Sequence, residues 1–253
     1  MRKAGILMPI TSLPSPYGIG TMGEAAREFV RFLHKAGQSY WQILPICPTS
    51  YGDSPYQSFS SYAGNPYMID LDELSEVGLL EKDEYKNIDW GSNPEKADYG
   101  LLYNRRFGVL RKAAKTAEEK YQTELTEFRK ENHKWLSDYA LFMACKKLHH
   151  GADWLHWPDE YRCPTLEFKA GLFKSMHEDI EYYRFIQFLF FDEWKRIKKY
   201  ANDHDIRIIG DIPIYVAYDS ADTWAHPELF QLDEENVPLA VAGCPPDGFA
   251  ADG

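Results

Sequence analysis

Three things are scarce in this sequence of 253 residues: cysteine, long apolar runs and basic side chains. The four cysteines form no C-x-x-C pair and have no histidine nearby at zinc-finger spacing, so neither a disulfide framework nor a metal site is indicated. No stretch approaches about 18 consecutive apolar residues, and the first residues become polar and proline-rich too early for a secretory signal. We therefore predict a cytoplasmic protein that does not enter a membrane.

The shortage of basic residues excludes another class of partner. Lysine and arginine together number 28, against 39 aspartates and glutamates, which gives a formal net charge of -11. Binding to a nucleic-acid backbone depends mainly on clustered lysine and arginine, so this balance argues against a nucleic-acid partner. Hydrophobic residues make up 44% of the chain, enough to bury a substantial core in one large domain or two small ones.

The segment YGDSPYQSFSSYAGNP, residues 51–66, also lacks lysine and arginine. Four aromatic residues alternate there with small polar ones, namely Tyr51, Tyr56, Phe59 and Tyr62. A flat aromatic face can cover the apolar C–H face of a sugar ring while neighbouring hydroxyl, carboxylate and amide groups bond the sugar hydroxyls. We therefore predict a ligand site for a neutral, hydroxyl-rich ring on this loop. The alternative is that the aromatics are packing residues and the serines turn formers.

The amino-terminal part of the chain is typical of a strand, a helix and a second strand. A short apolar run at residues 5–8 leads into a loop rich in proline, glycine and serine. The capping box Thr21-x-x-Glu24 predicts the start of a helix, and Gly37 predicts its end. The buried stripe of this helix is predicted to consist of Ala26, Phe29, Val30 and Leu33. A second apolar run at residues 40–46 follows closely, which predicts two neighbouring parallel strands.

From residue 74 to residue 178 the pattern changes to helices with dense mixed charge, which predicts an inserted helical subdomain. Within it, residues 111–134 hold seven basic and five acidic residues and are predicted to form a solvated helical face. Apolar residues at helical spacing then predict a core helix that ends near residues 202–205. Its expected core residues are Tyr182, Phe185, Ile186, Leu189, Phe190, Trp194 and Ile197. The chain is thus divided into residues 1–73, 74–178 and 179–253.

A third strand, buried, is predicted at residues 206–210, and Pro213 should end its pairing because proline has no N–H to donate. Asp211 then lies at the carboxyl end of a parallel strand, where the active sites of α/β folds collect. A role beside a ligand or a catalytic group is one interpretation of Asp211. The other is a solvated carboxylate that caps a local backbone N–H. A glycine- and proline-rich loop further on offers Asp247 and Phe249 as one polar and one aromatic contact.

Four segments together closely resemble one known family. They are GILMPITSLPSPYGIG at residues 5–20, YWQILPICPTSYGDSPYQSFSSYAGNPYMIDL at residues 40–71, GDIPIYV at residues 210–216, and WAHPELFQLDEENVPLAVAGCPPDGF at residues 224–249. With these segments the chain is similar, over essentially its whole length, to the amylomaltases. These are the 4-α-glucanotransferases of glycoside hydrolase family 77, also called disproportionating enzymes.

The resemblance implies both a fold and an activity. The fold is an α/β (β/α)8 TIM barrel with an inserted helical subdomain, of which this chain would supply the first three strands. The activity is the transfer of a 1,4-α-glucan segment from one maltooligosaccharide to another by a retaining mechanism, with one carboxylate as nucleophile and a second as acid/base. The family needs no metal or organic cofactor, and its partners are maltooligosaccharides and other α-1,4-glucans.

The resemblance also implies roles for particular residues. Ser54 and Tyr56 resemble glucan contacts in the acceptor and donor cleft, and Tyr51 resembles an aromatic residue at a secondary glucan site. Asp211 resembles the strand-end aspartate of the family's first conserved region, which lies near the chemistry without performing it.

Asp247, Gly248 and Phe249 match the family's loop that arches over the cleft and touches bound glucan, and we count Asp247 and Phe249 among the substrate-binding residues. Many relatives carry tyrosine at the position of Gly248, so that aromatic contact is missing here. A site that prefers sugar over water as acceptor must exclude bulk water, and Phe249 with the apolar residues 240–242 is our hypothesis for that lid.

No catalytic residue can be assigned in this sequence. In the family the nucleophilic aspartate lies in an Arg-x-Asp-His-Phe-Arg segment, which does not occur here, and the acid/base and stabilising carboxylates follow later still. All three are therefore expected beyond Gly253. Only three of the eight strands of a barrel are indicated. We expect the sequence to be the amino-terminal half of an amylomaltase whose partner is the missing carboxy-terminal half, and we expect no transferase activity from these residues alone.

Two other functions remain open. A non-catalytic α-glucan-binding fragment could still hold oligosaccharide with Tyr51, Tyr56 and Phe249. A starch hydrolase related to the α-amylases is the third interpretation. Against it stands GDIPIYV at residues 210–216, because those hydrolases usually show an Asp-x-x-x-x-Asn-His pattern after the same strand.

Overall fold

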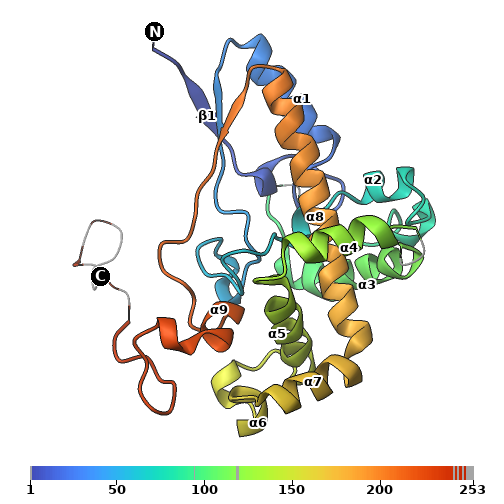
Figure 1. Cartoon of the computed structure of the whole chain (residues 1–253). Helices are drawn as coiled ribbons and strands as arrows, with labels where there is room; N and C mark the ends of the chain where they lie inside the picture. Colours follow the sequence, from blue (N-terminus) through green and yellow to red (C-terminus); the bar gives the residue numbers. More distant parts are fainter. Residues whose placement is uncertain are drawn as a thin grey trace.

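The computed structural model describes residues 2–93, 95–117, 120–241, 243, 245–246 and 248. Figure 1 shows a short sheet beside one long helix, with shorter helices packed along it. The strands are β1 (Gly5–Leu7), β2 (Tyr40–Gln42) and β3 (Arg207–Ile209). The helices are α1 (Glu24–Lys35), α2 (Leu71–Glu76), α3 (Tyr99–Ala117), α4 (Gln122–Glu131), α5 (Leu136–Leu148), α6 (Asp159–Arg162), α7 (Leu166–Ser175), α8 (His177–Asp203) and α9 (Ala221–Ala225).

The sheet has the order β1-β2-β3, and both pairs of neighbouring strands are parallel. Gly5 lies opposite Tyr40, which in turn lies opposite Arg207. The predicted parallel pairing is therefore confirmed. Each strand is shorter than the apolar run that predicted it. Pro9 and Pro45 follow the first two strands closely and have no N–H with which the ladder could continue.

The prediction that the third strand is buried is wrong for part of its length. Ile206, just before β3, is fully buried, but Ile209 is 43% exposed and Leu7 in β1 is 52% exposed. Side chains alternate between the two faces of a strand, so the middle residue of each strand faces the helices, as the buried Trp41 does. The residues on either side of it point to the opposite face of the sheet, which is accessible to solvent.

The start of α1 differs from its prediction, whereas its end agrees with it. The N-cap is Gly23 and not Thr21 of the Thr21-x-x-Glu24 pattern, because the Thr21 hydroxyl donates to Asp70 Oδ2 at 2.6 Å instead. Only glycine fits at position 23, since a Cβ there would lie 2.1 Å from the same Asp70 oxygen. Gly37 follows the C-cap with a φ of 67°, as the prediction requires.

The long helix α8 runs through the core, and its prediction is confirmed. Of the predicted core residues only Trp194 is partly exposed, while Tyr182, Phe185, Ile186, Leu189, Phe190 and Ile197 are buried. The helix ends at Asp203, within the predicted range. Helices α1, α3, α4, α5 and α7 pack against it, and so does β3. Because α8 contacts both the sheet and the helical region, it fixes their relative positions (Figure 1).

Residues 111–134 are a solvated face only on their outward side. The inward side of α3 and α4 is buried, for example at Ala113 and Leu125. Some of the basic residues fasten these helices to the first turns of α8. Arg111 pairs with Asp179 at 2.7 Å, and Arg129 pairs with Glu181.

Candidate functional site

The predicted site residues after β2 and β3 meet at the carboxyl edge of the sheet. The Tyr56 hydroxyl donates to Asp211 Oδ2 at 2.7 Å, although the two residues are 155 positions apart in the chain. The other oxygen of Asp211 accepts the backbone N–H of Ile212 at 2.8 Å. One oxygen of Asp211 therefore caps a local amide, which is one of the two interpretations considered from the sequence, and the other oxygen holds an aromatic residue of the neighbouring loop. A role of Asp211 beside a ligand or a catalytic group stays a prediction.

A tight turn presents these aromatics. The backbone N–H of Ser50 donates to the carbonyl of Gln57 at 3.0 Å and closes the base of the turn. At its tip Gly52 and Asp53 adopt φ angles of 77° and 56°, a left-handed pair that glycine makes possible at low conformational cost. The Ser54 hydroxyl accepts the backbone N–H two residues further on at 3.3 Å, so it shapes the turn that carries the tyrosines.

Three of the four aromatic residues of this loop face solvent. Tyr51 is 61% exposed, Tyr56 is 46% exposed and Tyr62 is 62% exposed. Tyr62 stacks on Trp135 with ring centroids 6.3 Å apart, while Phe59 packs against the core. The packing interpretation thus describes Phe59, whereas Tyr51 and Tyr56 keep a ring face available to a ligand.

The hydroxyl groups of both exposed tyrosines at this edge have defined acceptors. The hydrogen bond to Asp211 is the main reason that the pKa of Tyr56 lies above its ordinary value. Partial burial, followed by the charge of Asp219, raises the pKa of Tyr51, whose hydroxyl donates to the backbone carbonyl of Gly151. Both phenols therefore keep their protons, and their rings are held in place from the hydroxyl end.

The far end of the loop is anchored on α8. Gln187, fully buried, accepts the backbone N–H of Gly64 at 2.7 Å and donates to its carbonyl at 2.9 Å. Residue 64 must be glycine, because a Cβ would lie 1.9 Å from the ring of Phe190. These contacts make the loop a preformed surface, which reduces the ordering that binding would otherwise require.

The middle of the loop is tied to the segment that follows β3. The backbone carbonyl of Phe59 accepts the N–H of Ala221 at 2.9 Å, and Asp222 Oδ2 accepts the N–H of Ser61 at 2.9 Å. Burial raises the pKa of Asp222. The loop after β2 and the segment after β3 therefore form one connected surface.

Sequence reasoning missed the residues that support this surface from below, chiefly Gln187, Asp222 and the buried Lys146. For Gln187 one signal was available, since it interrupts the apolar stripe of α8. Of the four predicted site residues within the described ranges, Tyr56 and Asp211 are in direct contact at the carboxyl edge, and the other two lie on the same loop as Tyr56. The four are Tyr51, Ser54, Tyr56 and Asp211.

Two other predicted contacts, Asp247 and Phe249, lie outside the described residues, and so does Gly253, beyond which the catalytic carboxylates are expected. The contact of the arching loop with glucan, the lid hypothesis and the position of the three carboxylates therefore stay predictions.

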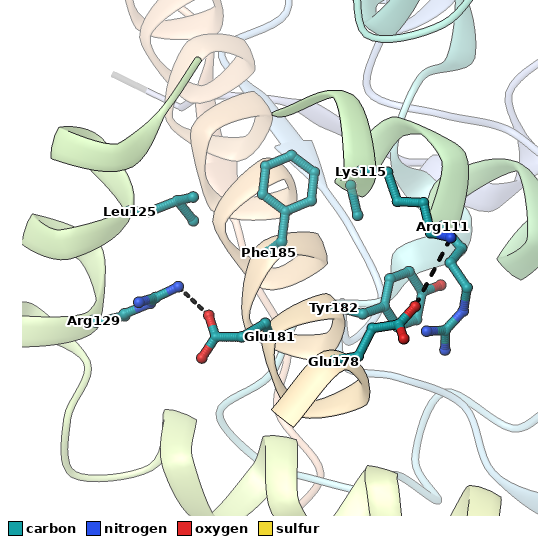
Figure 2. A pocket seen from close by; sticks show the side chains of 9 residues that line it. Arg111, Lys115, Leu125, Arg129, Glu178, Glu181, Tyr182 and Phe185 are labelled. Atoms are coloured by element: carbon teal, nitrogen blue, oxygen red, sulfur yellow. Dashed lines mark hydrogen bonds and ion pairs between the residues drawn. The ribbon is translucent and has the colours of Figure 1, made fainter. Parts of the chain in front are cut away.

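A cavity elsewhere in the molecule does not compete with this surface. Figure 2 shows it between α3, α4 and α8, bordered by two ion pairs, Arg129 with Glu181 and Lys115 with Glu178. Its volume of about 30 Å³ has room for about one water molecule. None of the predicted site residues lines it.

The described residues form neither a group suited to bind a metal ion nor a helix suited to cross a membrane. Within residues 2–93, 95–117, 120–241, 243, 245–246 and 248, no three histidine, cysteine, aspartate or glutamate side chains are grouped so that they could hold a metal ion. In the same part of the chain no helix has the length and apolar character that a membrane crossing needs. The described cysteines, Cys47, Cys145 and Cys163, are free thiols.

Comparison of the sequence with known proteins identifies relatives of this chain. A family model described as 4-alpha-glucanotransferase matches residues 8–253. A 4-alpha-glucanotransferase of Clostridium butyricum is 49% identical and covers 97% of this chain, and one of Thermus thermophilus is 47% identical and covers all of it. These matches take in 51% and 50% of the two relatives, so the chain spans about half the length of the curated relatives it matches.

Solved structures agree with the sequence relatives. The amylomaltase from Streptococcus agalactiae in complex with acarbose is 45% identical, with a TM-score of 0.95 over 99% of this chain and 51% of that one. The amylomaltase from Corynebacterium glutamicum has a TM-score of 0.67 at 19% identity over 89% of this chain and 32% of that one, a likeness of fold alone.

Proposed function

The chain belongs to the 4-alpha-glucanotransferase family, glycoside hydrolase family 77, and from that premise we propose that it serves the transfer of 1,4-α-glucan segments between maltooligosaccharides. In this proposal the parallel strands β1–β3 are the first three of a (β/α)8 barrel, and residues 74–178 are a helical insertion. The transfer proceeds with retention, through a glucosyl-enzyme that a second sugar intercepts.

The observation that carries the proposal is the pair formed by Tyr56 and Asp211 at the carboxyl edge of the sheet, with Tyr51 exposed on the same loop. Active sites of barrels lie at this edge. The ring faces of the two tyrosines suit the C–H face of a glucose unit, and the Ser54 hydroxyl and the Asp211 carboxylate suit its hydroxyls. The family's relative from Streptococcus agalactiae was solved with acarbose, which supports an oligosaccharide ligand here.

We assign substrate contact to Ser54, Tyr56, Asp211, Asp247 and Phe249. Tyr51 is assigned to a secondary glucan site. Asp211 holds Tyr56 in position and does not itself perform the chemistry.

The proposal assigns no catalytic carboxylate to residues 1–253, because the Arg-x-Asp-His-Phe-Arg segment of the family's nucleophile does not occur among them. A polypeptide of this sequence by itself should therefore release no glucose from maltotriose and form no longer glucans. Appearance of both products with the purified polypeptide would overturn this part of the proposal.

Glucan binding is tested by calorimetric titration with maltoheptaose. The chain should bind with measurable heat, and Tyr56→Ala should weaken binding because it removes both the ring face and the contact with Asp211. Phe32→Ala is the matched control: Phe32 is 53% exposed, close to the 46% of Tyr56, but lies near the carboxyl end of α1, which runs back toward the opposite edge of the sheet. Equal affinity for wild type and Tyr56→Ala would contradict the assignment.

A further inference from the structure

Lys146 in α5 is a buried cation directly behind the candidate surface. It is only 4% exposed, which is unusual for a lysine. Burying an ammonium group is unfavourable unless a partner of opposite charge and further hydrogen bonds compensate for the lost water. A lysine retained at such a position therefore needs a structural explanation.

The Lys146 ammonium group is the point at which three segments meet. It donates to Asp219 Oδ2 at 2.5 Å and to the backbone carbonyl of Ala152 at 3.2 Å. It also lies 5.7 Å from the ring centroid of Tyr51 and 4.9 Å from that of Phe59. The aromatic loop, the turn after α5 and the segment after β3 are thus joined through one side chain.

The same lysine reaches Tyr51 by a second route. The Tyr51 hydroxyl donates to the carbonyl of Gly151, which lies in the turn after α5. Lys146 closes that turn at both ends: its carbonyl accepts the N–H of Gly151 at 2.8 Å, and its ammonium group binds Ala152. The ring of Tyr51 therefore lies beside the Lys146 ammonium group, and its hydroxyl is bound by the turn that Lys146 closes.

We propose that Lys146, through its ion pair with Asp219, is the positioning residue that fixes Tyr51 for contact with glucan. This inference rests on the proposed function, since it assigns a purpose to the position of Tyr51. Neither Lys146 nor Asp219 touches the ligand. Their effect is to hold an exposed ring in one orientation, so that binding does not have to order it.

The variant that tests the proposal removes both charges. Lys146→Met alone would leave the Asp219 carboxylate buried without its partner and would destabilise the fold for that reason. Lys146→Met combined with Asp219→Asn avoids this, because both charges are removed together. Methionine is similar in length to the lysine it replaces, and asparagine has nearly the same shape as aspartate. Lys147→Met is the matched control: Lys147 is the next residue in α5, and it pairs with Asp179 at 2.7 Å on the exposed side of the helix.

The first measurement needs no ligand. The amides of Ser50, Asp53 and Gln57 are hydrogen-bonded within the loop. In the double variant their hydrogen exchange should accelerate about tenfold through local opening, while amides in the middle of α8 keep their rates. Unchanged loop rates would overturn the proposal, and so would an equal acceleration in α8, because that would show general destabilisation. If the double variant does not fold, Asp219→Asn alone replaces it, because the asparagine oxygen still accepts a hydrogen bond from the buried Lys146 ammonium group. The same local acceleration is then expected at smaller size. Unchanged loop rates, or an equal acceleration in α8, would overturn the proposal here as well.

The second measurement is a mutant cycle with maltoheptaose. The double variant should weaken binding about two- to tenfold, the range expected when one side chain must be ordered on binding. In a Tyr51→Ala background the same change should have no further effect, because the ring that Lys146 positions is gone. Equal losses in both backgrounds would overturn the proposal. Absence of binding by the wild-type chain would count against the proposed function instead, and the exchange rates would still decide the positioning role.

Discussion

Replacing Gln187 with leucine should destabilise the chain by several kcal/mol, because it removes the anchor of the aromatic loop. Gly64 is buried, and its N–H and C=O bond only the Gln187 amide in the described structure, at 2.7 and 2.9 Å. Each buried backbone group left without a partner costs about 1–3 kcal/mol, so the two together cost about 2–6 kcal/mol. Leucine fills a similar volume, which keeps any packing loss small.

The assay is urea unfolding followed by tryptophan fluorescence, with the midpoint and the slope fitted separately. A loss of this size is a large part of the about 5–15 kcal/mol that stabilises a typical domain. Gln122→Leu is the control, since Gln122 is exposed at the first position of α4 and should change stability by less than about 0.5 kcal/mol. If Gln187→Leu loses less than about 1 kcal/mol, the loop does not depend on this anchor.

Three further outcomes are expected. Burial raises the pKa of Glu193 well above its ordinary value in the folded chain. The folded chain therefore keeps a proton on Glu193 at pH values where the unfolded chain has lost it. For this reason the contribution of Glu193 to the free energy of unfolding is largest at acid pH and decreases as the pH rises. In urea unfolding, the Glu193→Gln variant should therefore lose less stability than the wild type between pH 5 and pH 8. An equal loss in the two proteins would argue against a protonated Glu193. Burial raises the pKa of the Cys47 thiol to about 11 and that of Cys145 to about 12, so among the described cysteines iodoacetamide at pH 8 should label the exposed Cys163 before the buried pair, as peptide mass spectrometry would show. Labelling of the buried pair before Cys163 would refute this. Gly64→Ala should cost about 1–3 kcal/mol of stability through overlap with a buried phenylalanine ring, and a neutral effect in urea unfolding would show that the loop can shift.

The sheet and the long helix could be predicted because their signals are local. Apolar runs located all three strands, and the apolar spacing from Tyr182 onward located α8 and its end. The start of α1 could not be predicted in the same way. Thr21 has the right sequence for a cap, but Asp70, 49 positions later, binds its hydroxyl. A local pattern cannot show that a distant side chain competes for the same group.

In the candidate site, too, local features could be predicted from the sequence and contacts between distant residues could not. Composition predicted that Tyr51 and Tyr56 would be available to a ligand, and the position after β3 placed Asp211 at the same edge. The hydrogen bond between Tyr56 and Asp211 depends on the shape of a turn with two left-handed residues, which the sequence does not specify. The supports of the loop, Gln187 and Lys146, lie on helices far away in the chain, and buried polar partners of this kind emerge only once the helices are packed.

The most direct test of the central claim, that glucan binds at the carboxyl edge beside Tyr51 and Tyr56, is a titration of the chain with maltoheptaose observed through ¹³C-labelled tyrosine rings. The ring signals of Tyr51 and Tyr56 should each shift and saturate as maltoheptaose is added, while the signals of the buried rings of Tyr139 and Tyr182 keep their positions. Saturable shifts confined to other tyrosines, or no shifts at any concentration of maltoheptaose, would contradict the claim.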